Sequence, residues 1–98
     1  MIDGTYDVEL INSAIRKKGT MEIRSEGDRF SAEIKVPLIG TQQVEGSLDG
    51  NNFSAEGTFK LMFVGKIAYT MRGEAIDDGL HMFLETSKGD FEAIGTRI

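Results

Sequence analysis

The chain has no cysteine, no tryptophan, one histidine and one proline among its 98 residues. The absence of cysteine excludes a disulfide, a thiolate nucleophile and a cysteine-ligated zinc ion. No apolar run approaches the ~20 residues of a membrane-spanning helix, and the N-terminus lacks the basic and apolar segments of a secretory signal. We therefore expect a cytoplasmic protein without a membrane partner, whose fold depends on side-chain packing alone.

Positive charge is also scarce, since 11 Lys and Arg residues stand against 16 Asp and Glu residues and leave a net charge of −5. Such a chain repels phosphate backbones, so the composition argues against a nucleic-acid partner. A chain of this length has room for one domain with one modest core. We expect residues 1–98 to form that domain.

The sequence does contain a clear alternation of apolar and polar residues with a period of two. Tyr6, Val8 and Leu10, for example, alternate with polar neighbours. This period is typical of a β-strand with one buried face. It recurs in eight segments separated by turn sequences rich in Gly, Asp and Asn. Strands joined by such short turns pair with their neighbours, which predicts an all-β antiparallel meander closed into an eight-stranded up-and-down barrel.

One hairpin sequence occurs twice, as "EGDRFSAEI" in residues 26–34 and "DGNNFSAEG" in residues 49–57. The turn residues reverse the chain, and the phenylalanine that follows each turn falls on the inward register. Four glycines share the inward register of the predicted strands, where they either bend the sheet or leave interior space. These glycines are Gly46, Gly57, Gly73 and Gly95.

Several segments carry a resemblance to a known family. They are the opening Asp3-Gly4-Thr5-Tyr6, the "PLIG" of residues 37–40, the repeated Asp-Gly-x-x-Phe-Ser turn, the segment "VGKIAYTMRGE" and the closing "GDFEAIGTRI". Over its whole length the chain resembles a group of small bacterial single-domain β-barrels with calycin-like architecture, similar to lipocalins and streptavidin. The resemblance implies a calycin-like barrel. The opening strand also resembles the calycin-like negative regulators of type III secretion genes, barrels that act by binding a partner protein.

No residue pattern indicates catalysis, a metal site or a cofactor. His81 falls on the polar register without a nucleophile near it in the sequence, so we expect a structural, solvent-facing side chain. Asp77 and Asp78 suit a hairpin turn better than acid–base catalysis. The sequence therefore predicts a protein that is not an enzyme and needs no cofactor.

The interior of an eight-stranded barrel can be filled by its own side chains or can hold one small ligand, and both interpretations stay open here. A ligand would contact inward aromatic and methionine side chains, with the tyrosine hydroxyls fixing its orientation. Residues 12–18 are expected to form a loop at the barrel mouth, where basic side chains either meet an anionic ligand group or are simply solvated. The candidate ligand-binding residues are Tyr6, Tyr69, Phe30, Phe59, Met71, Arg16 and Lys18.

The outward register of the last four predicted strands contains apolar residues where polar ones are expected. They are Met62, Val64, Ile76, Phe83 and Ile94. If contiguous, they would form an interface with a protein partner or with a second copy of the chain; an error of register is the alternative. The sequence thus predicts a carrier or sensor of a small apolar ligand, or else a regulatory barrel that acts through its outer wall, as a homodimer.

Overall fold

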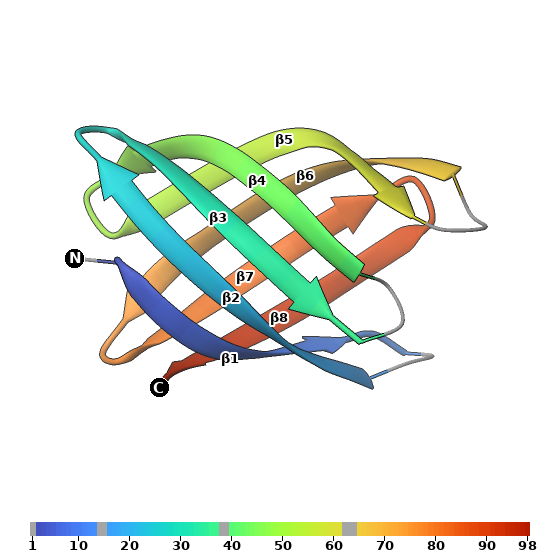
Figure 1. Ribbon diagram of the computed structural model, residues 1–98, viewed down its shortest axis with the longest axis horizontal. Helices are drawn as coiled ribbons and strands as arrows, with labels where there is room; N and C mark the ends of the chain where they lie inside the picture. Colours follow the sequence, from blue (N-terminus) through green and yellow to red (C-terminus); the bar gives the residue numbers. More distant parts are fainter. Residues whose placement is uncertain (1, 14–15, 38–39, 62–64) are drawn as a thin grey trace.

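The computed structural model describes residues 2–13, 16–37, 40–61 and 65–98, and its regular structure consists of β-strands (Figure 1). Each strand pairs antiparallel with the next, and the last pairs with the first, so the sheet closes into a barrel. The strands are β1 (Gly4–Ile11), β2 (Arg16–Glu26), β3 (Arg29–Val36), β4 (Gly40–Asp49), β5 (Asn52–Leu61), β6 (Gly65–Ile76), β7 (Gly79–Thr86) and β8 (Gly89–Arg97). The predicted all-β meander of eight strands is confirmed. These residues contain no helix that could cross a membrane.

The alternation in the sequence corresponds to the inner and outer faces of this barrel. Residues directly opposite each other on paired strands point to the same face, and Tyr6 of β1 lies opposite Met21 of β2. Both side chains are almost completely buried. Their neighbours along the strand, Asp7 and Glu22, are exposed. The apolar residues therefore meet inside the barrel and the polar residues face outward.

The barrel has two different ends. Three two-residue turns, at residues 27–28, 50–51 and 77–78, lie at the end that also holds both chain termini, and we call it the turn end (Figure 1). Gly27 and Gly50 have positive φ angles of 63° and 64°, which is the left-handed conformation that glycine adopts without strain. At the opposite end, which we call the far end, β1 stops at Ile11 and β2 starts at Arg16.

Aromatic rings cover two of the inward glycines, Gly46 and Gly73. A Cβ atom added to Gly46 would lie 2.7 Å from Cε1 of Phe30, and one added to Gly73 would lie 2.6 Å from Cζ of Phe53. The rings of Phe30 and Phe53, the phenylalanines of the repeated hairpin sequence, meet edge to face with centroids 5.6 Å apart. At these two positions glycine makes room for a ring rather than leaving space for a ligand.

The turn end is closed by polar contacts between the two ends of the chain. The Tyr6 hydroxyl donates a hydrogen bond of 2.8 Å to the Ile2 carbonyl, and Arg97 Nη2 donates to the same hydroxyl at 2.8 Å. Arg97 Nη1 donates to the Asp3 carbonyl at 2.6 Å, and the guanidinium lies 5.0 Å from the centre of the Tyr6 ring. Charge-assisted hydrogen bonds and a cation–π contact thus hold Ile2 and Tyr6 over the core.

Candidate functional site

Half-buried apolar side chains pack against the core at both ends of the barrel, and more of them lie toward the far end than toward the turn end, where they are Leu48 and Ala75. A contiguous core of buried residues extends from Ile2 through the middle of the barrel, and several half-buried side chains pack against it. Val36 and Ile67 are buried without belonging to that core. The half-buried residues that lie toward the far end are Leu10, Ile34, Phe59 and Leu84. Interior apolar surface is therefore still accessible at this end.

Two aromatic rings stack at the far end. Phe59 of β5 and Tyr69 of β6 are parallel, with centroids 4.1 Å apart and an interplanar angle of 7°. The Tyr69 ring lies over Gly57, because a Cβ atom added there would be 3.2 Å from the tyrosine oxygen. Burial raises the pKa of the Tyr69 phenol, and the charge of Glu45 raises it further.

The Tyr69 hydroxyl has no hydrogen-bond partner within the described ranges of the chain. Among the same residues, no side-chain polar atom is both fully buried and unpaired. The Tyr69 oxygen must therefore reach solvent, although only 6% of the residue is exposed. A buried ring with one accessible, unpaired hydroxyl can orient a ligand through a hydrogen bond.

The ladder between β4 and β5 ends before the strands do. Its pairs run only from Gly46 opposite Ala55 to Asp49 opposite Asn52, although β4 begins at Gly40 and β5 continues to Leu61 (Figure 1). Beyond the ladder, the side chain of Gln42 donates a hydrogen bond of 3.0 Å to the Lys60 carbonyl. We call this unpaired stretch the β4–β5 seam.

Two residues of the strands that border the seam lie near the Tyr69 hydroxyl. Gly57 of β5 lies beyond the last β4–β5 pair and is exposed even though it is on the inward register. Glu45 stands on β4 close enough for its charge to act on the Tyr69 phenol. Gly57 and Glu45 therefore both lie beside the Tyr69 hydroxyl.

The predicted loop over residues 12–18 is wrong in its second half. β2 begins at Arg16, because residues 16–18 pair with the last residues of β1. Arg16 and Lys18 point outward, opposite Ile11 and Glu9, and Arg16 Nη1 lies 3.2 Å from Glu9 Oε1. Their placement gives no support to contact with a ligand inside the barrel.

Lys17, between Arg16 and Lys18, has the inward position that the sequence had suggested for those two residues. It lies opposite Leu10, so its side chain is on the inward face, and it is half-buried. Sequence reasoning included Lys17 in the basic run but did not single it out, because the strand register that turns it inward depends on pairing with β1.

The other predicted ligand-binding residues belong to the packed core. Tyr6 is occupied by Ile2 and Arg97, and Phe30 packs on Phe53. Met71 is 3% exposed and lies in the middle of β6, opposite Ala55 and Leu84. Of the seven residues in that set, Tyr69 and Phe59 are the two that the structure brings together at the far end.

The predicted apolar wall is present in part. Ile76, Phe83 and Ile94 are outward-facing, with exposed fractions of 48%, 49% and 46%. Phe83 and Ile94 are diagonal neighbours on β7 and β8, since Phe83 lies opposite Glu92 and His81 opposite Ile94. Met62 and Val64 lie outside the described residues.

His81 has an acidic partner on the next strand. Its Nε2 atom lies 2.5 Å from Oε2 of Glu92, and its ring is 4.8 Å from the Phe83 ring. The sequence did not suggest this pair, because the two residues are 11 positions apart and meet only through the β7–β8 register. The described residues contain no group of three or more side chains that could hold a metal ion.

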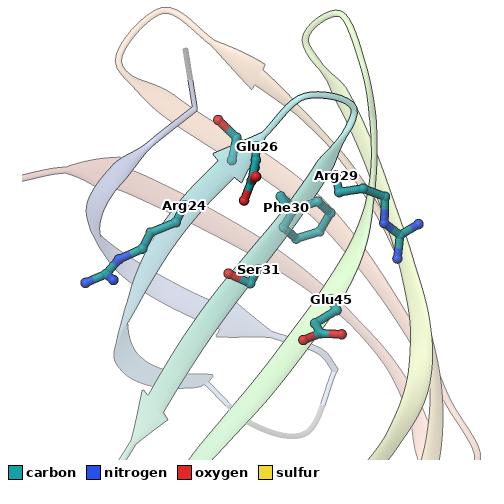
Figure 2. A pocket seen from close by; sticks show the side chains of 7 residues that line it. Arg24, Glu26, Arg29, Phe30, Ser31 and Glu45 are labelled. Carbon is teal, nitrogen blue, oxygen red and sulfur yellow. The ribbon is translucent and has the colours of Figure 1, made fainter.

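A shallow groove of about 390 Å³ crosses the outer surface of β2, β3 and β4. Figure 2 shows that Arg24, Ser31 and Glu45 line it from these three strands, with the Phe30 ring behind β3. Its charges are mixed, and Arg24 already pairs with Glu22 at 3.2 Å. The groove offers no arrangement of nucleophile and base.

Comparison with known proteins supports the fold and goes no further. No family model and no curated protein matches this sequence. A redesigned β-barrel is similar with a TM-score of 0.73 and 11% identity, over 99% of this chain and 91% of its own. A protein from Bacteroides fragilis, described as a "putative outer membrane protein", is similar with a TM-score of 0.59 and 15% identity. That likeness covers 98% of this chain and half of the other.

Both likenesses show that the chain is a small eight-stranded antiparallel β-barrel. The resemblance to calycin-like barrels, and that of the first strand to regulators of type III secretion genes, stays a prediction.

Proposed function

We propose that this barrel binds one small apolar molecule at its far end and works as a carrier or sensor rather than as an enzyme. The supporting observation is the contrast between the ends. Arg97, Tyr6 and Ile2 close the turn end, whereas the stacked Phe59 and Tyr69 rings lie among half-buried apolar side chains at the far end. Apolar walls with few polar groups are typical of small-molecule sites.

The polar groups at the far end suit ligand orientation rather than reaction chemistry. The Tyr69 hydroxyl can donate or accept one hydrogen bond, and a ligand with an acceptor atom can take the proton that the hydroxyl offers. The Gln42 amide holds the seam by donating to the Lys60 carbonyl, which leaves its own carbonyl oxygen as an acceptor. The proposal gives these groups no role in bond cleavage.

The charges on the outer face agree with a barrel that works in water. Outward positions carry ion pairs such as Arg72 with Glu85, 2.9 Å apart, and Lys35 with Glu33, 3.3 Å apart. Charged side chains on the outer face are strongly hydrated, so contact of this face with water is favoured over contact with an apolar phase such as lipid. We therefore propose an aqueous protein with neither nucleic-acid nor membrane partners, in line with the expected cytoplasmic location.

Two adjacent residues of β7 test the proposal. Leu84 points inward at the far end and is half-buried, while Phe83 points outward. We expect N-phenyl-1-naphthylamine, a neutral apolar dye, to gain fluorescence on binding to the protein, and Leu84→Trp to remove most of the binding by filling the interior. Phe83→Trp is the matched control and should bind as the native protein does.

A second measurement uses protein purified from its own source. Native mass spectrometry should show a small molecule that remains bound and that is absent from Leu84→Trp purified in the same way. A clean ligand-free mass, together with no dye binding, would remove the proposed function.

The exposed apolar wall favours one further candidate, a barrel that associates with a protein partner or with a second copy of itself. Phe83 and Ile94 expose large apolar side chains on adjacent strands, and such clusters mark interfaces. Light scattering should then show a mass above that of one chain, and Phe83→Asp should reduce it to the monomer. A monomeric mass for the native protein would eliminate the homodimer.

A further inference from the structure

We propose that the ligand at the far end is an apolar molecule with a single negative charge, held by the ammonium group of Lys17. The proposal rests on the function proposed above and names the chemical class of the ligand. It assigns the anion-binding role to the one basic residue of the run 16–18 whose position in the strand points it inward.

Charge on the inner face is rare. On the inward register of the described strands, two residues carry a charged side chain: Arg97 at the turn end and Lys17 at the far end. Arg97 is engaged by Tyr6 and by the Asp3 carbonyl. Lys17 therefore supplies the only cation on the inner face at the far end, within the part of the chain that the structure describes.

Lys17 has no ion-pair or hydrogen-bond partner within the described ranges. Its outward neighbour Arg16 does have one, in Glu9. Lys17 is also half-buried, and its direct partner Leu10 packs against the core. Its alkyl stem can lie along this apolar surface while the ammonium group stays at the rim, which is the usual arrangement for a partly buried lysine.

This geometry fits an amphipathic ligand. The apolar part would contact Phe59, Leu84 and Leu10, and the anion would meet the ammonium group at the rim. One cation balances one negative charge, and the chain as a whole carries a net charge of −5, which disfavours a dianion such as a phosphate monoester. A carboxylate or a sulfonate is the chemistry that the site fits.

A pair of dyes separates the contribution of the charge from that of the apolar part. 1-Anilinonaphthalene-8-sulfonate carries the same ring system as N-phenyl-1-naphthylamine with one sulfonate added. We expect the native protein to bind the sulfonated dye more tightly than Lys17→Met does, by roughly three- to tenfold, while the neutral dye binds both equally. Added salt should weaken only the sulfonated dye.

Lys18→Met is the matched control, because it removes the same charge one residue away on the outer face. Lys17→Glu should shift the preference further toward the neutral dye. Circular dichroism would verify that each variant is folded.

The outcomes distinguish this inference from the proposed function. If the neutral dye binds and Lys17→Met leaves the preference for the sulfonate unchanged, or if Lys18→Met lowers it equally, the assignment to Lys17 is wrong although the barrel still binds apolar molecules. If the native protein binds neither dye, the proposed function fails and this inference fails with it.

Discussion

Replacing Phe30 and Phe59 by alanine, one at a time, measures how differently the two ends of the barrel are packed. Phe30 is 4% exposed, meets Phe53 edge to face and covers Gly46. Phe59 is half-buried and contacts Tyr69 by stacking. Both residues are inward-facing phenylalanines of the same barrel, so the comparison isolates their surroundings.

The expected costs differ severalfold. Removing a fully buried phenylalanine side chain loses its transfer free energy and leaves a closed cavity, which together cost about 3–5 kcal/mol. At Phe59 the side chain is already partly solvated and water can enter the vacated space. The cavity contribution then falls away, and about 1–2 kcal/mol of lost burial remains. The difference is a large share of the ~5–15 kcal/mol by which a domain of this size is stable.

Urea denaturation monitored by circular dichroism gives the two free energies of unfolding. With a slope of about 1 kcal/mol per molar urea, Phe30→Ala should lower the midpoint by roughly 3–5 M and Phe59→Ala by roughly 1–2 M. If Phe30→Ala does not fold, Phe30→Leu and Phe59→Leu make the same comparison with smaller losses. Equal costs at the two positions would mean that the far end is packed as tightly as the turn end, and the structural argument for a ligand there would fail.

Three further outcomes are expected. Gly73→Ala places a methyl group 2.6 Å from Cζ of Phe53 and should lower the free energy of unfolding by about 1–3 kcal/mol. Gly57→Ala places its methyl group 3.2 Å from the Tyr69 oxygen and should lower it less. Thermal melts that rank the two variants the other way would contradict the packing. Arg97→Met leaves Tyr6 and the Asp3 carbonyl without their donor and should cost about 1–3 kcal/mol in the same melts; an unchanged melting temperature would show that the turn end does not need this contact. Hydrogen bonds donated by the Ser25 hydroxyl and, with a smaller effect, by the Ser25 backbone amide lower the pKa of Asp3 below 3.8. The Asp3 carboxylate therefore contributes stability at neutral pH, and this contribution is lost as the pH falls through the lowered pKa. The drop in stability below about pH 4 should be shallower in Asp3→Asn.

The fold could be predicted from the sequence because the alternation of apolar and polar residues and the turn sequences are local signals. Alternation along segments such as Tyr6 to Leu10 depends only on local residue chemistry, and the turns at residues 27–28, 50–51 and 77–78 fall at the Gly- and Asp-containing sequences that suggested them. The start of β2 could not be read in this way. Its first residues, Arg16 to Lys18, have no alternation, and they become a strand because β1 offers them a pairing edge.

The candidate site could be predicted only in its residue types. Aromatic side chains on the inward register were visible in the alternation, and so was the basic run. Three features depend on contacts between segments: the end of the β4–β5 ladder at Gly46, the stacking of Phe59 on Tyr69, and the pair of His81 with Glu92. Each is fixed by register between strands, which no single segment of sequence determines.

The pairing of β1 with β8 also has a consequence for the rate at which the barrel opens. Every other ladder joins neighbouring strands through a short connection, but Tyr6 opposite Arg97 and Ile11 opposite Glu92 bring together the two ends of the chain. Closing a loop of that length costs roughly 3 kcal/mol more entropy than closing a hairpin turn. We therefore expect this ladder to form late in folding, so that substitutions along it accelerate unfolding and leave the folding rate nearly unchanged in stopped-flow measurements.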